Sequence, residues 1–153
     1  MSAEQKLKEL GIEIGAAPAP VGNYVAAVRT GNLVFVSGVV PVRPDGSRAI
    51  GKLGAGVSVE EGYEAARLCA IGLLSRLRVE VGSLDRVRRV VKITGYVNAT
   101  PDFTEHAQVM NGASDLLAAV FGEAGKHARA AVGMGSLPLG VPVEVEMVAE
   151  VES

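Results

Sequence analysis

The chain is poor in the residues that build metal and cofactor sites. It has one cysteine, two histidines and no tryptophan among 153 residues. Cys69 alone cannot form an intramolecular disulfide or complete a thiolate metal site. His106 and His127 lie too far apart in sequence to act as a ligand pair on one helical turn. The sequence therefore predicts neither a bound metal nor a cofactor.

Positive charge and aromatic side chains are also in short supply. The formal net charge is −2, the sequence pI is about 5.7 and aromatic residues make up 4% of the chain. The one dense basic run, 86–89, is typical of a solvated strand end. Nucleic-acid binders usually carry a basic surface and aromatic groups that stack on bases. We therefore expect no nucleic-acid partner.

Long apolar runs are absent. No segment approaches the roughly 20 apolar residues that cross a bilayer, and residues 1–12 are too charged for a signal peptide core. These features predict a cytoplasmic protein with no membrane contact. A length of 153 residues predicts a single domain, 1–153, with residues 1–14 as an N-terminal helical extension. That extension has few large apolar side chains, so we expect it to pack on the rim of the domain.

Hydrophobic periodicity and capping signals predict the order of the elements. Ser58 and Glu61 form a capping box that begins one long helix, whose inward stripe includes Cys69. Thr100 and Pro101 predict the start of a second long helix, which ends at Gly122. Strands are expected over the β-rich runs 24–29, 33–40, 87–98, 127–136 and 143 onward, and residues 41–56 are expected to form an irregular loop.

This order predicts an α+β domain in which one mixed sheet carries both long helices on one face. The opposite face of the sheet then needs an explanation. Apolar residues occur at both parities of 33–40 and 87–97, so both faces of these strands have apolar side chains. We therefore expect the second face to be buried against other copies of the protein.

Arg129 is the most informative candidate functional residue. In an extended strand it shares one face with Ala131, Gly133 and Gly135, which leave space beside a fixed cation. A guanidinium needs an acidic partner or a ligand. One interpretation is a structural salt bridge with Glu144 or Glu146; the other is a pocket for a small carboxylate. Spacing alone leaves both open.

Several motifs resemble the RidA family, also called the YjgF or L-PSP endoribonuclease-like family. The resemblance covers residues 15–152 and includes the fifteen-residue separation of Arg129 and Glu144. Its other elements are the segments 22–24, 31–38, 102–103, 137–138 and 143–146, together with Asn111 and Val132. It implies a chorismate-mutase-like fold and a homotrimer with ligand pockets between subunits.

The resemblance also implies an activity. RidA-type deaminases hydrolyse reactive enamine or imine intermediates of amino acids, such as 2-aminoacrylate, to 2-keto acids and ammonia. By this resemblance Arg129 would bind the substrate carboxylate and Glu144 would orient the attacking water. Tyr24, Ser37 and Asn111 would line the pocket, partly from a neighbouring subunit, and no metal or cofactor would be required.

Two positions depart from the deaminase pattern and keep other functions open. Ala131 stands where the deaminases often have cysteine, and His127 where proline is common. The segment before Asn111 is also longer. These departures indicate a divergent subfamily. The alternatives are a non-catalytic trimer that binds a small carboxylate or a protein partner and, least favoured, an endoribonuclease.

Overall fold

A computed structural model describes residues 1–153, and its main feature is a five-stranded mixed sheet. The strands follow the order β1-β2-β7-β5-β6, with β5 and β6 parallel and the other neighbours antiparallel. Their bounds are β1 Ala27–Thr30, β2 Leu33–Val39, β5 Val87–Asn98, β6 Ala128–Met134 and β7 Val143–Val151. Two short strands, β3 Lys52–Leu53 and β4 Gly56–Val57, pair separately within the predicted loop.

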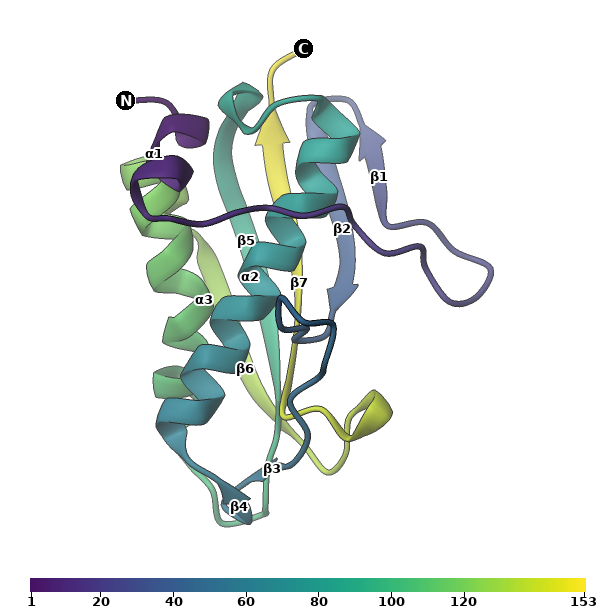
Figure 1. Cartoon of the computed structure of the whole chain (residues 1–153), viewed down its shortest axis with the longest axis vertical. Helices are drawn as coiled ribbons and strands as arrows, with labels where there is room; N and C mark the ends of the chain where they lie inside the picture. The colour runs from purple at the N-terminus through teal and green to yellow at the C-terminus, as the bar shows by residue number, and fades with distance from the viewer.

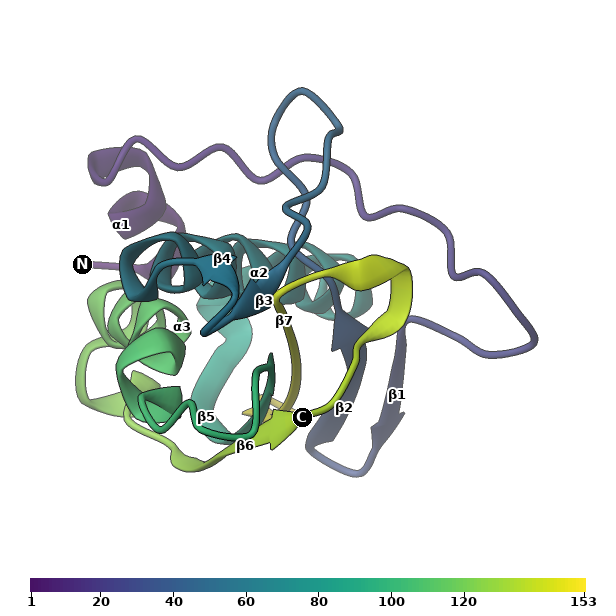
Figure 2. The ribbon, with the colours of Figure 1, turned by 90° about the horizontal axis from the view of Figure 1, so that it is seen from below.

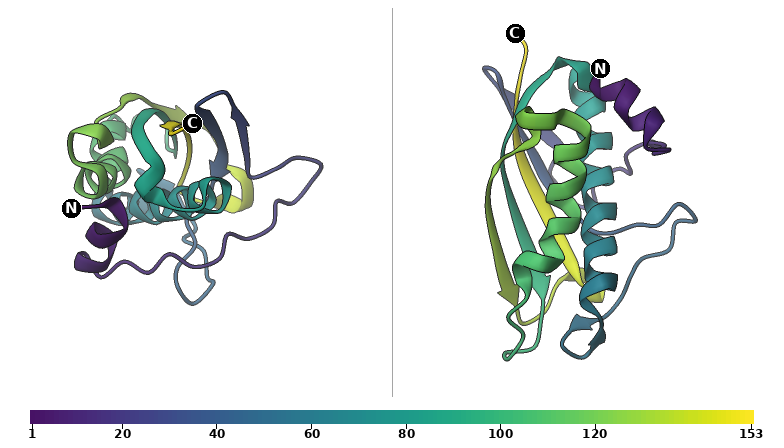
Figure 3. Two further views of the ribbon diagram at one scale, coloured as in Figure 1. Left: turned by 90° about the horizontal axis from the view of Figure 1, so that it is seen from above. Right: turned by 90° about the vertical axis from the view of Figure 1, so that its left-hand side faces the viewer.

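Both long helices cover the same face of the sheet (Figures 1, 2 and 3). Helix α2, Val59–Val81, lies over β7 and β2, and α3, His106–Phe121, packs beside it over β5 and β6. The core lies between these two layers. This is the predicted α+β architecture. None of the helices has the length and apolar character needed to cross a membrane.

The capping signal and apolar stripe of α2 are confirmed. The Ser58 hydroxyl accepts from the backbone N–H of Glu61, and the Glu61 carboxylate accepts from that of Ser58. The predicted inward stripe is fully buried. It comprises Ala66, Cys69, Ala70, Leu73 and Leu77.

The predicted start of the second helix is wrong by several residues. Thr100 does not cap it; instead its hydroxyl donates to the Asp102 carboxylate at 2.6 Å. The backbone N–H of Phe103 bonds to the Thr100 carbonyl, which closes a turn. Local side-chain bonds of this kind favour turns over helices. The helix begins at His106, after Glu105, without a side-chain cap.

The sheet face opposite the helices carries exposed apolar side chains. Val28, Leu33, Phe35 and Val132 are 37–53% exposed. The strand registers place all four on the side away from α2 and α3. In β7 that side has the partly buried Glu144, while the alternate residues of the strand are buried under α2.

The N-terminal helix α1, Ala3–Glu9, is held by a polar anchor as well as by one apolar residue. Leu7 is 2% exposed. The Glu4 carboxylate accepts from the Arg78 guanidinium at 3.1 and 2.5 Å and from the Leu84 backbone N–H at 3.0 Å. In return, the Glu4 N–H donates to Asp85 at 2.9 Å. Hydropathy alone does not reveal this anchor.

Glu4→Gln is expected to lower the free energy of unfolding by about 1–3 kcal/mol, because it removes a charged acceptor of three hydrogen bonds. Urea unfolding followed by circular dichroism measures the change. Glu9→Gln is the matched control. Glu9 makes an exposed ion pair with Lys6 at 3.4 Å, so its loss should cost at most about 0.5 kcal/mol. Equal effects of the two substitutions would contradict the anchor.

Candidate functional site

Arg129 extends from the edge strand β6 towards α3. It lies beside Ile93 in the parallel β5–β6 register, and Ile93 is fully buried under the helices. Its Nη1 donates to the Asn111 side-chain oxygen at 2.9 Å and to the Ser114 hydroxyl at 3.0 Å. Both acceptors belong to α3. The structure therefore brings together Arg129 and Asn111, two of the predicted site residues.

No carboxylate pairs with Arg129. The ion pairs of the protein are Lys6–Glu9, Arg78–Glu4 and Lys126–Glu123. The guanidinium is partly buried, and its Nε and Nη2 make no hydrogen bond to the protein. A salt bridge from Arg129 to Glu144 or Glu146 is absent. The edge of the guanidinium that suits a bidentate carboxylate thus has no protein partner.

Ser114 links Arg129 to His127. The Ser114 hydroxyl lies 2.9 Å from His127 Nε2, and His127 Nδ1 lies 2.6 Å from the Gly125 carbonyl oxygen. Burial lowers the pKa of His127, the Arg129 charge lowers it further, and the bond to Gly125 opposes them. The neutral imidazole is therefore favoured. His127 joins the site through Ser114 rather than as an isolated loop histidine.

The row of small residues beside Arg129 is only partly open. A Cβ atom at Gly133 would lie 2.7 Å from Nε2 of His106, so this imidazole occupies the space that Gly133 leaves. The His106 ring also packs edge-on against Phe103, with centroids 5.3 Å apart. Gly135 has no such neighbour within 4 Å. At Gly133 the small-residue face therefore accommodates the His106 side chain of α3, and at Gly135 it leaves open space.

Glu144 occupies the opposite face of the sheet, at a bulge in β2. The β2–β7 register shifts between Val36 and Val39. A Cβ at Gly38, within this bulge, would lie 3.1 Å from the Glu144 carboxyl, so glycine makes room for it. Burial raises the pKa of Glu144, the Glu146 carboxylate raises it further, and Arg76 lowers it. A partly desolvated carboxylate of this kind can hold and orient water.

Arg76 supports the bulge from the helix side. This nearly buried side chain, 9% exposed, donates from Nη1 to the carbonyls of Ser37 and Gly38 at 3.2 and 3.1 Å. Beside Glu144, the Tyr96 hydroxyl donates to Glu146 at 2.6 Å. This bond, with burial and the two carboxylates, raises the pKa of Tyr96 to about 12.

Ser37 and Tyr24 lie near the β1–β2 edge of the sheet, whereas Arg129 lies on β6 at the opposite edge. The Ser37 hydroxyl donates to the Val25 carbonyl at 2.7 Å, so it satisfies the backbone of the segment before β1. Tyr24, in the same segment, is 52% exposed. Strands β7 and β5 separate β2 from β6. Within one chain, these residues and Arg129 do not share a pocket.

Arg129 and Glu144 are likewise apart within one chain. Strand β5 lies between β6 and β7, a separation of roughly 10 Å. Arg129 is paired with Ile93 of β5, and Glu144 is paired with Tyr96 of the same strand. Ile93 and Tyr96 are an odd number of positions apart, so the side chains of Arg129 and Glu144 project from opposite faces. The fifteen-residue spacing in the sequence therefore does not make them neighbours in a single chain.

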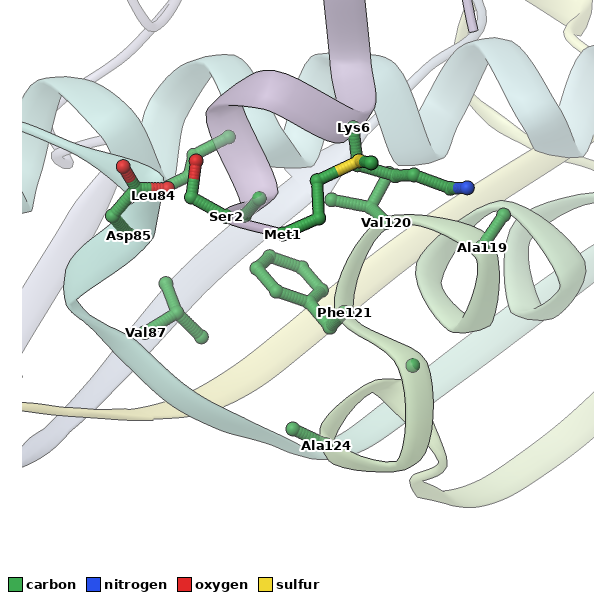
Figure 4. Close-up of a pocket in the computed structure, with 12 residues that line it drawn as sticks. Met1, Ser2, Lys6, Leu84, Asp85, Val87, Ala119, Val120, Phe121 and Ala124 are labelled. Atoms are coloured by element: carbon green, nitrogen blue, oxygen red, sulfur yellow. The ribbon is translucent and has the colours of Figure 1, made fainter. Parts of the chain in front are cut away.

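A surface pocket of about 520 Å³ lies elsewhere, between α1, the start of β5 and the end of α3. Figure 4 shows the Met1 side chain and the Phe121 ring on its walls. None of the predicted site residues lines it. No cluster of three or more His, Cys, Asp or Glu side chains is placed to hold a metal ion.

Sequence reasoning missed four contributors: Ser114, Arg76, Tyr96 and Glu146 as a partner of Tyr96. Ser114 follows Asn111 by three residues, so helical spacing could have placed both on the same side of α3. Arg76 gave no comparable signal, because it acts through a bulge that the sequence does not mark.

Comparisons with known proteins identify the family of this chain. Residues 4–151 match the sequence profile described as "YjgF/chorismate_mutase-like, putative endoribonuclease". The chain belongs to this family, the RidA family. The predicted chorismate-mutase-like fold is thereby confirmed.

The chain is 48% identical over 148 residues to Protein TCP17 of Trypanosoma cruzi, covering 96% of this chain and 92% of that protein. It is 43% identical, with a TM-score of 0.91, to the crystal structure of Atu1372 from Agrobacterium tumefaciens, a protein of unknown function; the coverage is 98% and 92%. RidA from an Antarctic Psychrobacter is 26% identical with a TM-score of 0.63, covering 88% and 94%.

The neutral state of His127 predicts a pH dependence of stability. Its folded pKa lies below the usual value of 6.5, so the unfolded chain takes up a proton first as the pH falls. The stability contributed by this group is present above about pH 6.5 and is lost as the pH falls through the folded pKa. Between pH 7 and 5, chemical unfolding should show a smaller loss in His127→Gln than in the wild type. Parallel curves would contradict this assignment.

Proposed function

We propose that this RidA-family protein hydrolyses imines of small 2-amino acids to 2-keto acids and ammonia. The observation that carries the proposal is the state of Arg129. Its guanidinium is held at Nη1 by two neutral acceptors and has no carboxylate partner, while Nε and Nη2 remain available. This arrangement suits a bidentate bond to the carboxylate of a small ligand.

The reaction needs a positioned water and a proton acceptor. In the proposed mechanism Glu144 accepts a proton from water as the water oxygen bonds to the imine carbon. The imine nitrogen gains a proton from solvent, which gives the carbinolamine. The carbinolamine then loses its hydroxyl proton to solvent, Glu144 returns its proton to the nitrogen, and the C–N bond breaks to give the keto acid and ammonia. A 2-aminoacrylate enamine first tautomerises to the imine: its terminal carbon gains a proton and its nitrogen loses one. Orientation and general base catalysis are sufficient for an electrophilic imine.

A complete site would require two subunits. Arg129 and Glu144 leave opposite faces of the sheet, and Tyr24 lies near its other edge. The exposed apolar side chains of the open face, Phe35 among them, favour contact with another copy. We infer a homotrimer in which one subunit supplies Arg129 and Asn111, and the adjacent subunit supplies Glu144 and Tyr24.

The first test is keto-acid release in a coupled assay, with a serine/threonine dehydratase generating the imine. The wild type should accelerate release. Arg129→Lys should lower kcat/KM at least about 10-fold, because lysine cannot form the bidentate pair. Glu144→Gln should lower kcat about 100-fold through loss of the base.

Glu150→Gln is the matched control. Glu150 is on the same strand and the same face as Glu144, but it lies opposite Leu33 and Arg89, far from the bulge. It should leave the rate unchanged. No acceleration by the wild type, or an Arg129→Lys variant as active as the wild type, would refute the deaminase.

Subunit mixing tests the shared site. Arg129→Ala and Glu144→Gln chains should each be nearly inactive alone. If each site combines the two residues across a subunit boundary, random mixed trimers should recover about one quarter of the wild-type activity. Recovery should appear after denaturation and joint refolding. Sedimentation analysis of the wild type should give about three times the chain mass; an inactive mixture of folded trimers would contradict the shared site.

The same Arg129 geometry would also serve a trimer that binds a small carboxylate without turnover. Binding of 2-ketobutyrate that requires Arg129, with no acceleration of keto-acid release, would favour this function. An endoribonuclease is less well supported. The open face presents Glu144, Glu146 and Glu150, and these carboxylates would repel an RNA backbone.

A further inference from the structure

The hydrogen bonds around Arg129 continue beyond the residues that touch it. Nη1 carries two hydrogens, and both have acceptors, the Asn111 side-chain oxygen and the Ser114 hydroxyl. Ser114 in turn has one further partner, His127 Nε2 at 2.9 Å. The side chain of Ser114 therefore stands between the guanidinium and the imidazole.

The donor and acceptor groups fix the direction of each hydrogen bond between Arg129, Ser114, His127 and Gly125. The Gly125 carbonyl can only accept, so His127 Nδ1, 2.6 Å away, must have the proton. In the neutral ring Nε2 is then the acceptor. Arginine can only donate, so the Ser114 oxygen accepts from Nη1 and sends its single hydrogen to His127. Each donor in this series of hydrogen bonds has one acceptor, so the directions of all the bonds are mutually consistent.

We propose that His127, acting through Ser114, is a positioning residue that immobilises the guanidinium of Arg129 with its Nε/Nη2 edge turned to the ligand carboxylate. This role deepens the proposed function, since it rests on carboxylate binding by Arg129. Donation of the Ser114 hydrogen to Nε2 directs the oxygen lone pairs towards Nη1 and polarises the hydroxyl, which strengthens the bond to arginine.

The alternative is that His127 only stabilises the start of β6. That role would require the bond from Nδ1 to Gly125 but not the bond from Nε2 to Ser114. The two bonds can be separated by substitution. His127→Gln retains an acceptor that reaches towards Ser114, His127→Ala retains neither bond, and Ser114→Ala removes the link itself.

The other histidine supplies the control. His106 also lies on α3 beside β6, where it packs against Phe103 and Gly133, and it makes no hydrogen bond to Arg129. His106→Gln therefore removes an imidazole from the same helix–strand boundary and leaves the chain from His127 to Arg129 intact.

The first experiment is NMR of the folded protein without ligand. Imidazole ¹⁵N shifts should show the Nδ1–H tautomer for His127 at neutral pH. Rotation of the Arg129 guanidinium about its Nε–Cζ bond should be slow in the wild type and in His106→Gln. It should be roughly tenfold faster in Ser114→Ala and His127→Ala, because one restraining bond is lost or weakened.

The second experiment measures kcat and KM in the imine assay. Loss of positioning should raise KM roughly 5–10-fold in His127→Ala with little change in kcat, because Arg129 holds the carboxylate equally in the bound substrate and in the transition state. His127→Gln should restore most of the affinity. In a double-mutant cycle, His127→Ala should have no further effect on KM in a Ser114→Ala background. Additive effects would overturn the positioning role.

The two experiments separate this inference from the proposed activity. If the wild type does not accelerate imine hydrolysis, the proposed deaminase activity is rejected, and the NMR experiment still tests the role of His127. An Nε2–H tautomer, or guanidinium rotation in a folded His127→Ala variant as slow as in the wild type, would overturn it. If activity is present but KM is unchanged in His127→Ala, the positioning role is rejected and the deaminase activity is retained.

Discussion

Packing of two long helices onto one face of the sheet is the constraint on which the rest of the structure depends. Because side chains alternate along a strand, burial of Val143, Val145 and Met147 under α2 commits Glu144 and Glu146 to the open face. The same rule directs Arg129 to the helix side, where α3 supplies its acceptors. Core packing thus assigns each polar group its face.

This assignment gives the two faces different chemistry. On the helix side, Arg129 is a cation with neutral partners. On the open side, Glu144 is a partly buried carboxylate beside a second carboxylate, and its pKa is raised. Arg129 and Glu144 therefore lie in different halves of the site. The separation keeps an arginine and a glutamate from neutralising each other within a chain, so each remains available for a ligand or for another subunit.

Much of the fold could be predicted from the sequence. The Ser58 capping box and the apolar stripe of α2 depend on local contacts, and both are confirmed. The cap-and-proline pattern at Thr100 and Pro101 predicts too early a start for α3, because the Thr100–Asp102 bond favours a turn that this pattern does not distinguish from a helix start. The polar anchor of α1 escaped prediction because Glu4 and Arg78 are distant in sequence.

By itself the sequence determined most of the elements, the family motifs and the isolated position of Arg129, since these follow from local periodicity and residue type. Only the tertiary structure decided what Arg129 contacts. The insertion of β5 between β6 and β7 removed Glu144 and Glu146 as partners. The packing of α3 supplied Ser114, and through it His127. Strand order and helix packing arise from long-range contacts, which sequence spacing does not encode.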